Sequence, residues 1–80
     1  MRQSIYSVYD SKIDAYGTPF FSPNHSVALR SFLQAKLDPN TSIHHFPDDF
    51  RLYCLGEFDD ASGLVSAQIP PTFIPENSTE

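Results

Sequence analysis

The chain has 80 residues, with 40% hydrophobic, 14% aromatic and 19% charged side chains and a formal net charge of −5. This length excludes a second domain with a core of its own, and the aromatic content excludes a wholly disordered chain. No apolar run approaches the roughly 20 residues of a membrane helix, and the first residues lack the apolar stretch of a signal peptide. We therefore expect a soluble intracellular domain whose small core favours self-association, for example as a homodimer.

Residues 4–10 predict the first strand, because isoleucine, tyrosine and valine favour extended backbone. The alternation places Tyr6 and Val8 on one side of that strand and Ile5 and Tyr9 on the other.

The next segment carries turn and edge signals. Residues 14–19 have the composition of a turn, in which Gly17 is free to adopt positive φ. Residues 19–23 are bounded by prolines and too short for a central strand, so they predict an edge strand or an extended strap over the core.

One amphipathic helix is expected over residues 25–37. Asn24 is a suitable N-cap, and Asp38-Pro39 ends the helix because a residue before proline disfavours α geometry. A period of 3.6 residues gathers an apolar stripe made of Ala28, Leu29, Phe32, Leu33 and Ala35. Residues 38–49 predict a polar loop that ends in a single helical turn at residues 47–50.

Residues 50–58 predict the longest strand, and bulky side chains on both of its faces predict a central position. Gly56 in that strand indicates a bulge or a close approach of another backbone. Residues 59–63 fit a hairpin loop, and residues 64–66 begin a returning strand. Residues 67–80 contain three prolines and an acidic end, which predict an extended or disordered tail.

These elements predict an α+β fold, in which residues 1–66 form a single domain. It consists of a small antiparallel sheet of three to four strands with one amphipathic helix packed on one face, followed by a proline-rich C-terminal tail.

Several side chains have the types found in metal or catalytic sites. His44, His45, Asp48 and Asp49 lack the spacing of a metal-ligand pair. Cys54 falls in the middle of the longest strand, where a cysteine usually packs as a small apolar residue, so no thiol nucleophile is expected there. The sequence predicts no enzyme, no metal site and no cofactor.

Two kinds of binding remain open. Residues 1–37 carry four basic and two acidic side chains, whereas residues 38–80 carry one basic and eight acidic side chains, so any DNA contact should use a minority of the surface. Aromatic rings beside cations on a small sheet can stack the bases of single-stranded nucleic acid, and Tyr6 or Tyr9 near Lys12 and Tyr53 beside Arg51 are the available pieces. A protein-interaction module fits the acidity better, with an exposed sheet face or edge or a proline-flanked segment as the docking surface.

The chain also resembles a known family. The resemblance spans about residues 4–66, in order and with few gaps. It is carried by Tyr6-Ser7-Val8-Tyr9-Asp10-Ser11-Lys12, by Pro19-Phe20-Phe21-Ser22-Pro23-Asn24, by a helix with Ala28, Arg30 and Phe32 that runs into Asp38-Pro39-Asn40, and by Pro47-Asp48-Asp49-Phe50-Arg51-Leu52-Tyr53 followed by Leu55-Gly56-Glu57-Phe58-Asp59-Asp60. These pieces are similar to the small non-structural protein of gokushoviruses, the microvirus subfamily of single-stranded DNA phages.

The resemblance implies a phage protein of the host bacterial cytoplasm that is DNA-binding or replication-associated. It implies a role in the switch from double-stranded replication to single-stranded genome synthesis and packaging. We expect a non-enzymatic replication accessory that acts on single-stranded DNA or on the phage replication complex. The candidate DNA-binding residues, chosen from the residues themselves, are Lys12, Arg30 and Arg51 for phosphates and Tyr53 for stacking. The alternative is a protein–protein module: an adaptor to a replication protein, a minor virion component or an inhibitor of a host enzyme.

Overall fold

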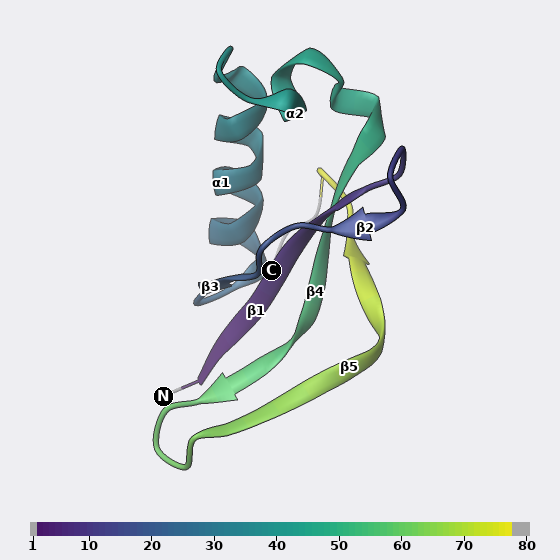
Figure 1. Ribbon diagram of the computed structural model, residues 1–80. Helices are drawn as coiled ribbons and strands as arrows, with labels where there is room; N and C mark the ends of the chain where they lie inside the picture. Colours follow the sequence, from purple (N-terminus) through teal and green to yellow (C-terminus); the bar gives the residue numbers. More distant parts are fainter. Residues whose placement is uncertain (1, 78–80) are drawn as a thin grey trace.

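A computed structural model describes residues 2–77 of the chain (Figure 1). The elements follow in the order β1 (Arg2–Asp10), β2 (Ala15–Tyr16), β3 (Phe20–Ser22), α1 (His25–Leu37), α2 (Ser42–His45), the 3₁₀ turn η1 (Pro47–Asp49), β4 (Phe50–Asp59) and β5 (Leu64–Ile74).

The strands form one antiparallel sheet of five strands, where the sequence predicted three to four. Its order is β2-β1-β4-β5, and β3 pairs with a different part of β1. Tyr9 of β1 pairs with Tyr16 of β2, whereas Ile5 of β1 pairs with Phe21 of β3. The central position predicted for residues 50–58 is confirmed, because β4 lies between β1 and β5. The α+β class is confirmed, although the protein is richer in strand than the sequence indicated.

Helix α1 has the predicted bounds, and its N-cap is also as predicted, since the side-chain oxygen of Asn24 accepts from the Val27 amide at 2.9 Å. The apolar stripe faces the sheet, where Ala28, Leu29 and Phe32 are buried. They form one core with β-strand side chains from β1, β4 and β5, namely Tyr6, Leu52, Cys54 and Ile74. The packing role predicted for the cysteine is therefore confirmed.

A β-bulge interrupts the pairing of β1 with β4. Tyr6 pairs with Cys54 but Ile5 pairs with Gly56, so Leu55 is an extra residue in β4. The bulge changes which residues share a face, because the alternation restarts after Leu55. The sequence indicated an irregularity at Gly56, and the structure places it there.

The sheet continues into the segment that the sequence predicted as a tail. Strand β5 pairs with β4 at residues 64–67 and again at residues 72–74, and residues 68–71 arch out between the two stretches. Ile74 is only 3% exposed and belongs to the core. The proline-rich segment is thus part of the domain up to residue 74, which corrects the expectation of a tail from residue 67. Residues 78–80 lie outside the described part.

Two short elements lie where the sequence predicted only turns and loops. Residues 15–16 pair with β1 as strand β2, inside the expected turn, and the residue with left-handed backbone there is Asp14 (φ 53°). Residues 42–45 form α2, whose N-cap Thr41 accepts from the His44 amide at 3.1 Å. The helical turn predicted at Pro47 is confirmed as η1.

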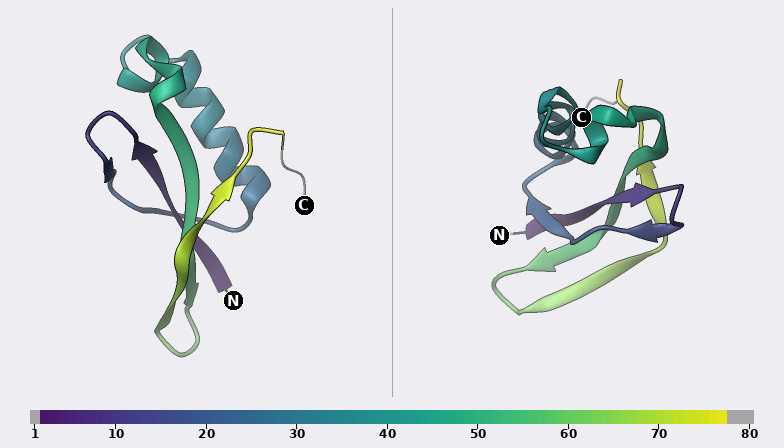
Figure 2. Two further views of the ribbon diagram at one scale, coloured as in Figure 1. Left: turned by 90° about the vertical axis from the view of Figure 1, so that its right-hand side faces the viewer. Right: turned by 45° about the horizontal axis from the view of Figure 1, so that its top comes forward.

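The molecule is elongated, with extents of 40 × 23 × 21 Å. Helix α1 covers one side of the upper half of the sheet, and the β4–β5 hairpin extends well beyond the helix (Figures 1 and 2). The helices described between residues 2 and 77 include none with the length and apolar character needed to cross a membrane.

Candidate nucleic-acid interface

Four aromatic rings from four strands meet on the sheet, and we call them the aromatic patch: Tyr9, Tyr16, Tyr53 and Phe73. Tyr9 lies 4.9 Å from Tyr16 and 5.9 Å from Tyr53, measured between ring centroids. Tyr53 lies 5.7 Å from Tyr16 and 5.7 Å from Phe73. These spacings are those of directly packed rings, so the patch is one continuous surface centred on Tyr53.

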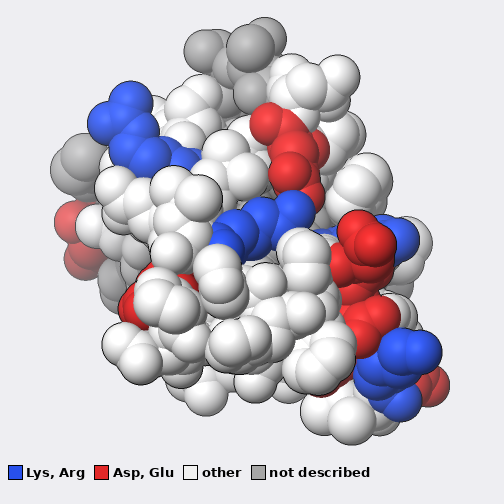
Figure 3. Space-filling model, turned by 90° about the horizontal axis from the view of Figure 1, so that it is seen from above, with Lys and Arg blue, Asp and Glu red and all other residues white. Residues whose placement is uncertain are grey.

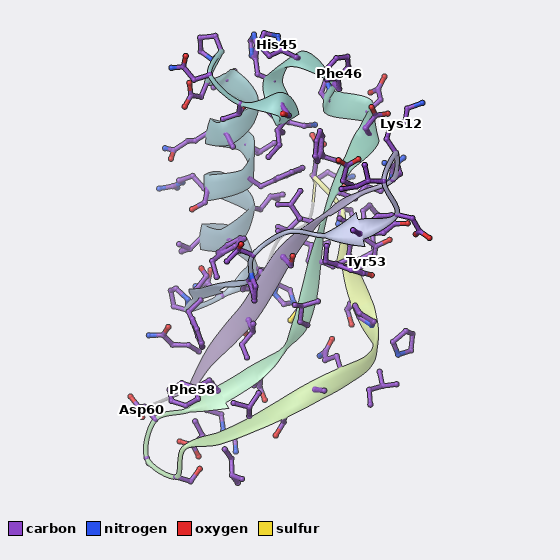
Figure 4. All side chains as sticks on the ribbon, in the orientation of Figure 1. Lys12, His45, Phe46, Tyr53, Phe58 and Asp60 are labelled. Carbon is purple, nitrogen blue, oxygen red and sulfur yellow. The ribbon has the colours of Figure 1, made fainter. Side chains whose placement is uncertain are left out.

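The patch lies on the side of the sheet opposite α1. Leu52 and Cys54, the neighbours of Tyr53 in β4, are buried in the core beneath the helix, so the alternation of a strand directs Tyr53 to the other side. Figure 4 shows the labelled Tyr53 on the side of the strands that faces away from α1. Tyr9 and Phe73 follow the same side, because the strand register places them next to Tyr53.

The rings remain accessible at the two ends of the patch. Tyr16 is 45% exposed and Phe73 is 47% exposed, whereas Tyr9 and Tyr53 are half-buried between them. Aromatic faces that are open to solvent in this way can stack the bases of a single strand, which contributes roughly 1–3 kcal/mol per base.

One of the three predicted phosphate-binding cations, Arg51, lies beside the patch. Lys12 is exposed in the turn that joins β1 to β2, and it lines a hollow with Phe46 and Phe50, next to α2 and η1. Arg51 is exposed and pairs with Tyr9 across β1 and β4. Its guanidinium donates to the carbonyl oxygen of Asp48 at 2.9 Å, which directs it toward η1.

The third predicted cation, Arg30, lies elsewhere. It is exposed on α1 and lines a groove together with Leu29, Leu33 and Leu37 of the same helix. Because α1 packs on the side of the sheet opposite Tyr53, the sheet separates Arg30 from Tyr53. In the view of Figure 3 the basic side chains occur in separate groups, with acidic or uncharged atoms between them, so this face has no continuous positive surface.

The sequence identified the centre of the patch but not all of its members. Tyr6, named as a ring that could stack, is fully buried, and its hydroxyl lies 2.6 Å from Nδ1 of His25. Tyr16 and Phe73 were missed because they lie in segments predicted as a turn and a tail. The sequence does contain a signal for the strand that includes Phe73, because the consecutive threonine, phenylalanine and isoleucine at residues 72–74 favour extended backbone.

The hydroxyl of Tyr9 donates a hydrogen bond to the carboxylate of Asp14. This bond is the main reason that the pKa of Tyr9 is raised above the ordinary 10.0 of tyrosine, because deprotonation would remove the bond and create a second negative charge. Any stabilisation from this bond is present below pH 10 and is lost as the pH rises through the raised pKa.

We therefore expect Asp14→Asn to lower the pH at which Tyr9 titrates. NMR titration of the tyrosine ring carbons measures this, with Tyr9→Phe assigning the signal. An unchanged Tyr9 midpoint in Asp14→Asn would contradict the assigned hydrogen bond.

The histidines and acidic residues near α2 do not form a metal cluster in the described chain. His44 Nδ1 lies 2.8 Å from the carbonyl oxygen of Lys36, and His45 Nε2 lies 2.9 Å from that of Pro39. Within residues 2–77 no group of three or more histidine, cysteine or acidic side chains is placed to hold a metal ion. These histidines connect α2 to the end of α1.

Comparison with known proteins gives two matches. The family model described as Phage ORF5 protein matches residues 3–79. Among curated proteins, Protein ORF5 of Chlamydia phage 1 is 33% identical over 67 residues, which cover 79% of this chain and 70% of that protein. No solved structure matches the chain.

Proposed function

Because the chain belongs to the Phage ORF5 protein family, we propose that it is a non-enzymatic replication accessory that binds single-stranded DNA through the aromatic patch. The resemblance to a small phage protein that the sequence predicted is confirmed by both matches. DNA binding is our proposal. The cluster of four rings on the sheet face opposite α1 is the observation that supports it.

In this proposal the bases of one strand stack on the exposed rings of Tyr16 and Phe73, and Tyr53 supports both. Arg51 at the margin of the patch contacts a phosphate, and Lys12 in the β1–β2 turn contacts another. Few cations lie there and the net charge is −5, so the affinity should be modest and should fall steeply with salt. A single strand suits this arrangement better than a duplex, whose bases are already stacked on one another.

Binding to one strand would let the protein act in the host cytoplasm at the step where genome synthesis changes from double-stranded to single-stranded product. By covering the displaced strand, it would prevent that strand from serving again as a template. Homodimer formation would place two patches on one strand and raise the affinity through a higher effective concentration.

The test is fluorescence anisotropy with a labelled deoxythymidine oligonucleotide over a salt series. We expect Phe73→Ala to weaken binding by about fivefold to a hundredfold, which corresponds to the loss of roughly one stacked base. Tyr53→Ala should weaken binding within the same range, because it removes the ring that supports both Tyr16 and Phe73. The matched control is Phe21→Ala, because Phe21 is 55% exposed and packs on Phe58, away from the patch. Thermal melts of each variant separate lost binding from lost folding. Absence of binding by the unmodified protein at low salt would overturn the proposal.

The acidic charge and several exposed apolar side chains favour a second candidate, a protein-binding module. Ile69 is 91% exposed on the arch of β5, and Leu64 and Val65 are 65% and 64% exposed on the β4–β5 hairpin. In this case the partner is a replication protein, a virion protein or a host enzyme. Retention of a phage or host protein on the immobilised chain, lost in Ile69→Ser but kept in Tyr53→Ala, would favour this candidate over DNA binding.

A further inference from the structure

A cavity of about 280 Å³ adjoins the aromatic patch. It lies between the last turns of α1, the 3₁₀ turn η1 and the paired ends of β4 and β5. Two basic residues, Lys36 and Arg51, and two acidic residues, Asp48 and Glu76, line it together with Phe73, whose ring also belongs to the patch. Phe73 therefore links the patch, on one side of the sheet, to a hollow beside α1 that contains two cations.

Lys36 is held in place before any ligand arrives. Its side chain is only 19% exposed, and its Nζ lies 5.4 Å from the centre of the Phe32 ring. A charge that is partly shielded from water interacts more strongly with an anion than a fully exposed charge does. A side chain that is already ordered also loses less entropy on binding.

In the free protein, Lys36 is already paired with a carboxylate of the same chain. The carboxylate of Glu76 accepts from Nζ of Lys36 and also lines the cavity. Glu76 is 51% exposed and follows the last strand, so its carboxylate can leave without disturbing the core. Arg51, across the cavity, donates one N–H to Asp48, and a guanidinium has five.

We propose that this cavity is a phosphate subsite, in which Lys36 and Arg51 bind a backbone phosphate of the strand that stacks on the aromatic patch. The Glu76 carboxylate takes the place of that phosphate in the free protein and competes with it. The inference rests on the proposed function and extends it, because it assigns Lys36, which the sequence did not single out, as a phosphate ligand. It also makes the end of β5 an internal competitor of DNA.

The test is anisotropy at low salt with the deoxythymidine oligonucleotide and the full chain carrying Glu76→Gln. We expect the affinity to rise about twofold to fivefold, the range that corresponds to releasing one ion pair. The matched control is Glu57→Gln, which removes the same charge from another ion pair. Glu57 lies 3.9 Å from Arg2 in an exposed pair, on strands away from the cavity, so its loss should change the affinity by less than about 1.5-fold.

Lys36→Gln should weaken binding of the oligonucleotide by itself. The double variant Lys36→Gln/Glu76→Gln should show none of the increase in affinity expected for Glu76→Gln. If Glu57→Gln and Glu76→Gln raise the affinity equally, only net charge matters and the phosphate subsite is overturned while DNA binding stands. If no variant binds the oligonucleotide, the proposed function itself fails. Thermal melts verify that every variant is folded.

Discussion

Phe32→Ala is expected to lower the free energy of unfolding by about 3–5 kcal/mol, the usual cost of removing a buried phenylalanine ring. Phe32 is 3% exposed and stands at the centre of the face that α1 turns toward the sheet. A domain of this size has only about 5–15 kcal/mol of stability, so the variant should be largely unfolded at moderate urea concentrations where the unmodified protein is folded.

Urea denaturation followed by circular dichroism measures this loss. Leu37→Ala is the matched control, because Leu37 ends the same helix but is 78% exposed, and its truncation should change stability by less than about 0.5 kcal/mol. A similar loss in both variants would mean that α1 does not pack on the sheet as described.

Gly56→Ala is expected to cost about 3 kcal/mol or more, the upper end of the range for overpacking. A Cβ atom added at Gly56 would lie 2.1 Å from the carbonyl oxygen of Ser66, which belongs to the backbone of the paired strand and cannot rotate away. The φ of +158° adds strain, since side chains rarely adopt it. The β4–β5 pairing must therefore shift, and the thermal midpoint should fall by about 12 °C or more.

Gly17→Ala provides the comparison for Gly56→Ala. A Cβ at Gly17 would lie 3.5 Å from the carbonyl oxygen of Val8, an ordinary contact distance, so this variant should keep a thermal midpoint within a few degrees of the unmodified protein. Equal midpoints for Gly56→Ala and the unmodified protein would contradict the described strand pairing.

The sequence predicted α1 and the core of β4 well because their signals are local. The N-cap at Asn24 and the period of apolar residues lie within one short segment. The alternation of residues 50–54 also suffices to place Leu52 and Cys54 in the core and Tyr53 on the opposite side. No knowledge of distant segments was needed for these predictions.

The aromatic patch needed information that a local pattern does not contain. Tyr9 and Tyr53 become neighbours only through the register between two strands that lie far apart in the sequence. Phe73 follows residues 68–71, which arch out of the sheet and contain a pair of prolines, so the sequence predicted a tail there. Gly56 indicated the bulge in β4, but the residues that the bulge sets opposite one another depend on the partner strand. The site was thus predictable at its centre and not at its margins.

The pairing of β1 with β4 also has a consequence for how the chain folds. Paired residues such as Tyr6 and Cys54 are separated by more than half of the chain. Strand β1 is therefore synthesised long before its partner β4. Closing such a long loop has an entropic cost that must be met before the contacts form, and contacts of this kind slow folding. By contrast, α1 and the β4–β5 hairpin are local, so we expect them to nucleate folding and β1 to dock last. During that interval β2 and β3 can pair with one edge of β1, but the edge that later pairs with β4 stays open, and we expect aggregation to begin at this edge.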